Sequence, residues 1–134
     1  MKMIITKEQA ENILTTYYKS KEDIDGKVEM KTTKEQVGYY TYNRMAAVTT
    51  FELSGTTSLL GTEISVKRTI PVEEYEGIFK NILQEQGYEL TNFLIDSGIR
   101  TFWTGYGFME REVEETYCNG IKLEVKQQVK ELKR

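Results

Sequence analysis

The chain has 134 residues and a net charge of −3, with 18 lysines and arginines against 21 acidic residues. It contains no histidine, which excludes Ser-His-Asp and Cys-His catalysis and every zinc site built on histidine ligands. The single cysteine, Cys118, excludes an intramolecular disulfide and any metal site that needs several cysteines. Hydrophobic residues make up 39% and charged residues 29%, which is typical of a folded domain, so we expect residues 1–134 to form a single domain.

Charge and hydropathy also limit the partners. A net negative charge argues against non-specific nucleic-acid binding. The longest uncharged run, 53–62, has about ten residues, which is half of what a membrane span needs. A lone cysteine suits a reducing compartment. We therefore predict a cytoplasmic protein with no membrane partner and no cofactor.

The first predicted element is a helix over 6–21. Thr6 and Gln9 have the spacing of a capping box at its start. The turn-forming pair Asp25-Gly26 is expected to end it. One apolar stripe follows the helical period, formed by Ala10, Ile13, Leu14 and Tyr17.

The next segments have the alternation of strands. One strand begins at 28–30, a second runs from Met45 to Leu53, and a third runs from Ile64 to Ile70. The intervening segment 54–61 is rich in Ser, Thr and Gly, which predicts a connecting loop.

A second helix is predicted over 71–86. Pro71 suits the first helical position, and Gly87 suits the position just after the last turn. Acidic residues in the first turn favour the positive end of the helix dipole. Its expected buried face consists of Val72, Tyr75, Ile78, Phe79 and Ile82.

Two hairpins are predicted in the remaining chain, one around 96–98 and one around 118–120, where Asn119-Gly120 is a strong turn signal. In the second hairpin, a three-residue loop would pair Val113 with Val125 and gather the apolar residues on one face. That register is preferred to a two-residue loop. It also puts Arg111 and Glu115 on the inward face, where they would either lie at the sheet rim or have a function, because a buried charge must be paired.

These elements predict an α+β fold in which two helices pack on a mainly antiparallel sheet. A faint internal repeat suggests two units, 5–69 and 70–129, each with one helix and three or four strands. The alternative is a chance likeness between amphipathic helices and between glycine turns. The repeat relates residues 65 positions apart, namely Ile5 and Ile70, Glu8 and Glu73, Glu11 and Glu76, and Ile13 and Ile78.

The segment 100–111 is the most unusual part of the sequence. It holds the only tryptophan, three further aromatic residues, two glycines and an arginine at each end. Aromatic rings beside guanidinium groups stack on bases and hold phosphates, and they are also enriched in protein interfaces. The alternative is that these rings pack on helices or neighbouring strands. The predicted binding residues are Arg100, Phe102, Trp103, Tyr106, Phe108, Arg111 and Glu115, with Tyr39, Tyr40, Tyr42 and Arg44 as a secondary set.

No motif in the chain identifies a reaction, and we predict no catalytic or metal-binding residue. The leading hypothesis is a small non-enzymatic binding or inhibitor protein, a homodimer, that acts by occupying a partner protein. Accessory anti-defence proteins of phages and mobile elements have this size and charge, which is an analogy only. The alternatives are a nucleotide-binding or other anion-binding protein, an immunity protein, and a histidine-free enzyme using Glu115.

Overall fold

The computed structural model describes residues 1–37 and 44–128, with only the backbone at Val37 and Arg44. It confirms the predicted α+β class. Between β5 and β6 lies a short 3-10 turn, Gly107–Met109. The elements in chain order are β1 (Lys2–Thr6), α1 (Lys7–Glu22), β2 (Asp25–Val37), β3 (Arg44–Leu59), β4 (Thr62–Ile70), α2 (Val72–Glu85), β5 (Tyr88–Thr104) and β6 (Arg111–Gln127).

The strands form two antiparallel sheets, with the orders β1-β6-β5 and β2-β3-β4. The first half of the chain, β1 to β3, and the second half, β4 to β6, each run strand, helix, strand, strand. The first strand of each half pairs with the last strand of the other half. Neither half therefore completes a three-stranded sheet by itself.

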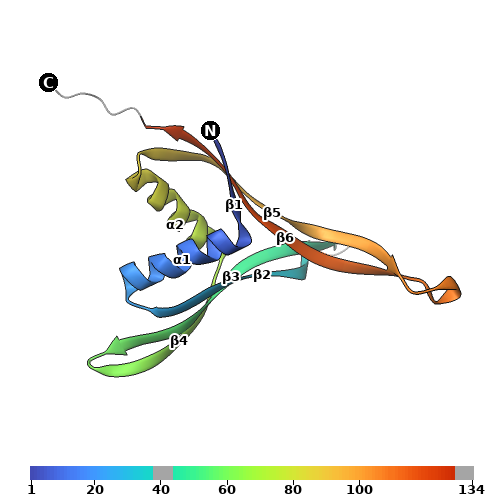
Figure 1. Ribbon diagram of the computed structural model, residues 1–134, viewed down its shortest axis with the longest axis horizontal. Helices are drawn as coiled ribbons and strands as arrows, with labels where there is room; N and C mark the ends of the chain where they lie inside the picture. Colours follow the sequence, from blue (N-terminus) through green and yellow to red (C-terminus); the bar gives the residue numbers. More distant parts are fainter. Residues whose placement is uncertain (38–43, 129–134) are drawn as a thin grey trace.

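The core lies where the two sheets diverge, and both helices fill the opening between them (Figure 1). The central strands β3 and β6 supply apolar side chains to this space, and the helices supply aromatic ones. Burial of each such side chain contributes roughly 1.5–3 kcal/mol. The largest fully buried side chains are Tyr18, Tyr75, Phe51, Phe79, Leu14, Leu53, Ile70, Ile121, Leu123 and Val28.

Helix α1 begins as predicted. The Thr6 hydroxyl accepts a hydrogen bond from the Gln9 N–H, and the Gln9 side chain accepts one from the Thr6 N–H, which completes the capping box. The helix ends at Asp23, which adopts a left-handed conformation, so the expected stop at 25–26 is wrong. Tyr18 is buried in place of the expected Tyr17, which lies at the edge of the core.

Helix α2 also follows its prediction, with Pro71 as its N-cap and Gly87 just beyond its end. Leu83 is buried at its C-terminal end, while Val72 is exposed. Neither helix of the described residues is long and apolar enough to cross a membrane.

The two predicted turns at 96–98 and 118–120 are wrong, because β5 and β6 run straight through them. The predicted connection over 54–61 is right only at its end, because β3 extends to Leu59 and the chain turns at Leu60 and Gly61 into β4. Gly55 lies opposite Gly26, and a side chain on either would collide with the other strand's backbone. Gly98 lies against the Tyr117 ring, and Gly120 lies against the backbone of Ile5. These glycines do not form turns. They allow close approach of neighbouring chain segments, which is a common reason for glycine within a strand.

The pairing of β5 with β6 also replaces the expected register. Val113 lies opposite Phe102, and Val125 lies opposite Leu90, so these two valines do not pair with each other. The two predicted hairpins are one long hairpin. Its turn is at 105–110, between the two positions where turns were predicted.

One polar cluster joins three elements around the core. Arg68 of β4 donates two hydrogen bonds of 2.7 Å to the two carboxylate oxygens of Glu74 in α2. The Tyr18 hydroxyl of α1 donates to the same carboxylate at 3.1 Å. The hydrogen bonds from Arg68 lower the pKa of Glu74. Burial, with the nearby Glu74 charge, raises the pKa of Tyr18.

We expect Glu74→Gln to lower the free energy of unfolding by about 1 kcal/mol at pH 7, since the pair is partly exposed to solvent. The pKa of Glu74 is lowered by folding, so its contribution is present above the ordinary carboxyl pKa and is lost as pH falls through the lowered value. Urea unfolding of both proteins at several pH values measures this difference.

The two stability curves should converge in acid. Glu85→Gln is the matched control, because Glu85 forms only an exposed pair with Lys21 at 3.9 Å. A Glu74→Gln deficit that stays constant down to the lowest pH would contradict an ionic origin.

We expect Gly120→Ala to cost more than about 2 kcal/mol of unfolding free energy. The new methyl group would collide with the Ile5 carbonyl, and the φ of 133° is one that side chains rarely adopt. Gly61→Ala is the control, because its φ of 81° is also positive but open space surrounds it. Equal losses in the two variants, measured by urea unfolding, would show that close packing against β1 is unimportant.

Candidate functional site

The outer parts of β5 and β6 form an arm that projects beyond the two helices (Figure 1). We define the arm as residues 97–118. Its pairs run without interruption from Ser97 and Cys118 to Thr104 and Arg111. Eight residues per strand give the paired part a length of about 25 Å.

The structure places the seven predicted binding residues together on this arm. Five of them belong to the strands, and Tyr106 and Phe108 belong to the turn that joins the strands. The seven are Arg100, Phe102, Trp103, Tyr106, Phe108, Arg111 and Glu115.

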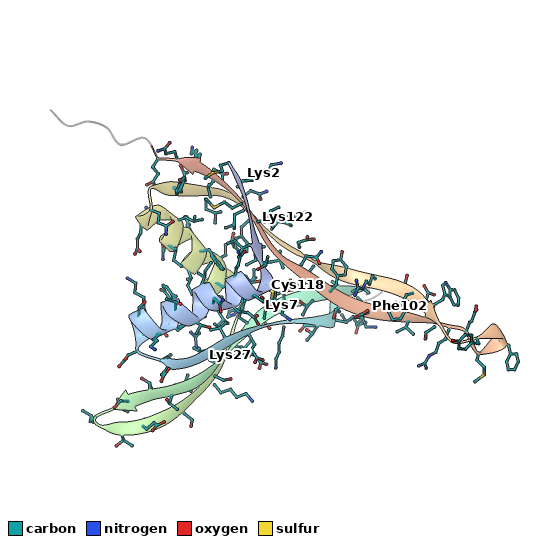
Figure 2. All side chains as sticks on the ribbon, viewed as in Figure 1. Lys2, Lys7, Lys27, Phe102, Cys118 and Lys122 are labelled. Carbon is teal, nitrogen blue, oxygen red and sulfur yellow. The ribbon has the colours of Figure 1, made fainter. Side chains whose placement is uncertain are left out.

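The end of the arm exposes large apolar side chains. Phe108 is 97% exposed, Tyr106 92%, and Trp103 and Met109 are each 69% exposed. Figure 2 shows Phe102 far out along the arm, with the side chains of the turn reaching into solvent beyond it. We call Trp103, Tyr106, Phe108 and Met109 the aromatic tip. Apolar side chains gathered in this way are uncommon on a surface that has no partner.

The backbone of the turn explains why the tip is exposed. Gly105 and Gly107 have positive φ values of 104° and 57°. A side chain on Gly105 would come within 2.5 Å of the Met109 carbonyl oxygen. The Met109 N–H donates to the Tyr106 carbonyl at 3.0 Å. In this tight turn Tyr106 and Phe108 remain exposed to solvent.

One face of the arm carries an apolar pair beside an exposed ion pair. Phe102 lies opposite Val113 on one face, beside the pair of Arg100 and Glu115, whose charged atoms are 3.4 Å apart. The Arg100 guanidinium also lies over the Tyr117 ring, 5.8 Å from its centroid. Both members of the ion pair are at least half exposed, so the expected burial of Glu115 is wrong.

Arg111 does not pair with Glu115 either. It is exposed at the start of β6, opposite Thr104. The expected inward face with Arg111 and Glu115 side by side is therefore wrong. An exposed ion pair of Glu115 with Arg100 contributes at most about 1 kcal/mol and supports no catalytic role.

The inner part of the arm is braced by β2. Lys34 forms an ion pair of 2.9 Å with Glu114, and the Thr116 hydroxyl donates to the Thr32 carbonyl at 3.2 Å. Thr32 is itself bonded to Thr49 of β3 at 2.9 Å. The sequence analysis missed these residues, because they lie about 80 positions apart and carry no motif. They fix the direction in which the arm projects.

The side chains of the secondary set of predicted binding residues lie outside the part of the chain that the structure describes. Tyr39, Tyr40 and Tyr42 lie outside the described residues. Arg44 is the first residue of β3, where only the backbone is described.

Within residues 1–37 and 44–128, no group of three or more Asp, Glu or Cys side chains is placed to hold a metal. Cys118, at the base of the arm, is partly buried with its sulfur 3.3 Å from that of Met30. Scans of known protein families, curated proteins and solved structures find no match to this chain.

Proposed function

We propose that the protein is a non-enzymatic binding protein that acts by occupying a partner protein, with the aromatic tip as its contact. The observation that carries this proposal is the exposure of four large apolar side chains at the end of a braced arm. Keeping that surface in water costs free energy, which is recovered only when another surface covers it.

The residue types favour a protein partner. Trp, Tyr, Phe, Met and Arg are the residues enriched at interface centres, and charged residues surround such centres. Glu110, Arg111 and Glu112 provide this charged rim beside the tip. Arg100 is already engaged by Glu115 and Tyr117, which leaves fewer cations for an anionic small molecule. A projecting arm is suited to enter a cleft of its partner.

The setting and the oligomer are part of the same proposal. A single, partly buried cysteine suits the reducing cytoplasm. Two copies can cover each other's tips, so the free protein is proposed to be a homodimer. An inhibitory accessory protein of a phage or mobile element fits this size and charge by analogy.

We expect the double variant Trp103→Ala/Tyr106→Ala to lose at least about a hundredfold in partner affinity, because both residues are of the type that dominates interfaces. The variant should remain folded, because both side chains are exposed. Purification of the partner with the wild-type protein, followed by titration with each variant, measures this.

The matched control is Leu59→Ala/Leu60→Ala, which removes exposed apolar side chains from the end of β3 and from the turn that follows it. It should bind the partner normally. A partner retained by Trp103→Ala/Tyr106→Ala would refute the role of the tip, and unfolding of that variant would return the two residues to the core.

Native mass spectrometry of gently purified protein tests the oligomer. We expect two copies of the 15.6 kDa chain, and a single copy for Trp103→Ala/Tyr106→Ala. A wild-type monomer would contradict the dimer. Retained extra mass of nucleotide size would favour the anion-binding alternative instead.

A further inference from the structure

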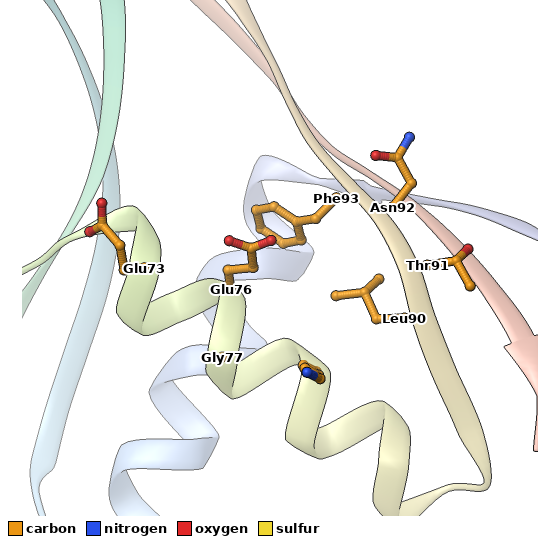
Figure 3. A pocket seen from close by; sticks show the side chains of 8 residues that line it. Glu73, Glu76, Gly77, Leu90, Thr91, Asn92 and Phe93 are labelled. Atoms are coloured by element: carbon orange, nitrogen blue, oxygen red, sulfur yellow. The ribbon is translucent and has the colours of Figure 1, made fainter.

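A second candidate site lies away from the arm, in a groove between α2 and β5 (Figure 3). Its volume is about 420 Å³, which is in the range of ligand pockets. One wall is the helix and the other is the first part of β5. The groove is lined by Glu73, Glu76, Gly77 and Lys80 of α2 and by residues 90–93 of β5.

The strand beside this groove has a free edge. The order β1-β6-β5 puts β5 at the edge of its sheet. Val125 of β6 exchanges both of its backbone hydrogen bonds with Met1, each at 2.9 Å, so its N–H and C=O point away from β5. Leu123, two residues earlier on the strand, points the same way. Its partner Phe93 therefore turns its N–H and C=O away from β6, toward the free edge of the sheet.

The first half of the chain shows what a closed version of this edge looks like. There β2 is the edge strand of the other sheet, and α1 lies beside it. The Met30 N–H donates to the Glu11 carboxylate at 2.8 Å, and the Val28 N–H donates to the Thr15 hydroxyl at 3.0 Å. Side chains of the helix thus satisfy the edge of β2.

The same positions in the second half are left open. Glu76 and Lys80 lie 65 residues after Glu11 and Thr15, just as Phe93 lies 65 residues after Val28. Within the described part of the chain, no hydrogen bond joins Glu76 or Lys80 to β5. The groove occupies the space between them.

Gly77 is a separate indication that the space between α2 and β5 is left open. It lies in the middle of α2, where a glycine costs about 1 kcal/mol relative to alanine. A side chain built there would meet nothing within 4 Å, so the packing of the protein does not require glycine. Because Gly77 has no side chain, this part of the helix leaves the groove unfilled.

The lining defines the ligand chemistry. Figure 3 shows Leu90 and Phe93 directed toward the helix, with Thr91 and Asn92 directed away from it. The register of β5 and β6 shifts at Thr91, whose hydroxyl donates to the Glu124 carbonyl at 3.0 Å, and this irregularity lets Leu90 and Phe93 both face the groove. Glu73 and Glu76 make one end acidic. Lys80 lies toward the other end, where it also borders a depression lined by Tyr88 and Gln128.

We propose that this groove binds an extended peptide that carries a basic side chain, which adds to the free edge of β5 as a further strand. Phe93 supplies backbone hydrogen bonds, the apolar lining takes one side of the peptide, and Glu73 and Glu76 take the basic group. This is the mode of peptide recognition in which pairing gives affinity and alternate side chains give specificity. The site is separate from the aromatic tip, so either proposal can fail alone.

Fluorescein-labelled acetylated pentapeptide amides that alternate Val with Lys are the probe, and peptides that alternate Val with Glu are the comparison. We expect fluorescence anisotropy to show binding of the Lys peptides only, and the Phe93 amide signal in NMR spectra to shift on binding. Glu76→Gln should weaken binding roughly three- to tenfold. Glu85→Gln, on the last turn of α2 and outside the groove lining, should bind as the wild type does.

Gly77→Leu is the decisive variant. A Cβ at this position meets nothing within 4 Å, and leucine has a higher helix propensity than glycine, so we expect the protein to be at least as stable as the wild type while the larger side chain abolishes peptide binding. Unchanged binding to Gly77→Leu, equal binding of the Glu peptides, or no binding of the Lys peptides would each overturn the proposal. Binding only after removal of residues 129–134 would assign the groove to that segment of the chain and overturn an external partner.

Discussion

The exchange of first strands between the two halves is the constraint on which the rest of the structure depends. β1 completes the sheet of the second half, and β4 completes the sheet of the first half. Each central strand, β3 or β6, therefore pairs with a strand from its own half and with one from the other. Both halves of the chain therefore contribute to each sheet and to the shared core.

The arm continues one of these sheets beyond the shared core. β6 pairs with β1 only over 120–124, and with β5 it forms one hairpin of 17 residues per strand. Only the inner part of that hairpin has a sheet neighbour or a helix to cover it. The outer part needs another support, and the contacts of Lys34 and Thr32 with Glu114 and Thr116 provide it. The aromatic tip lies beyond the last of these contacts.

The features that sequence reasoning predicted correctly depend on local interactions. The capping box at Thr6, the proline before α2 and the glycine after it all act within a few residues. The wrong turns depend on distant residues. Asn119-Gly120 has the sequence of a turn, but Gly120 is needed where Ile5 crosses it, and that contact is invisible without the fold. The aromatic residues of the arm could be identified from composition alone. The contacts between β2 and β6 that support the arm could not, because they join residues far apart in the sequence.

The two halves also show how one frame serves different purposes. Apolar positions such as Ile5 and Ile70 recur because both sheets need them. The sequence segments before β3 and β6 both begin with Gly-Tyr, and both strands begin with Arg. The shared ancestry of the halves stays a prediction, but the matching of their elements does not depend on it.

Glu11 and Glu76 are both glutamates and occupy matching positions on the two helices. Of these two residues, only Glu11 accepts a hydrogen bond from an edge strand in the described part of the chain. What differs around them is Thr15 against Lys80, and Asn12 against Gly77. A short hydroxyl closes the first edge by accepting its N–H, whereas a lysine has no acceptor to offer and a glycine leaves the wall open. These two differences, on one face of each helix, therefore explain why the edge of β2 is hydrogen-bonded to α1 whereas the edge of β5 is free to bind a ligand.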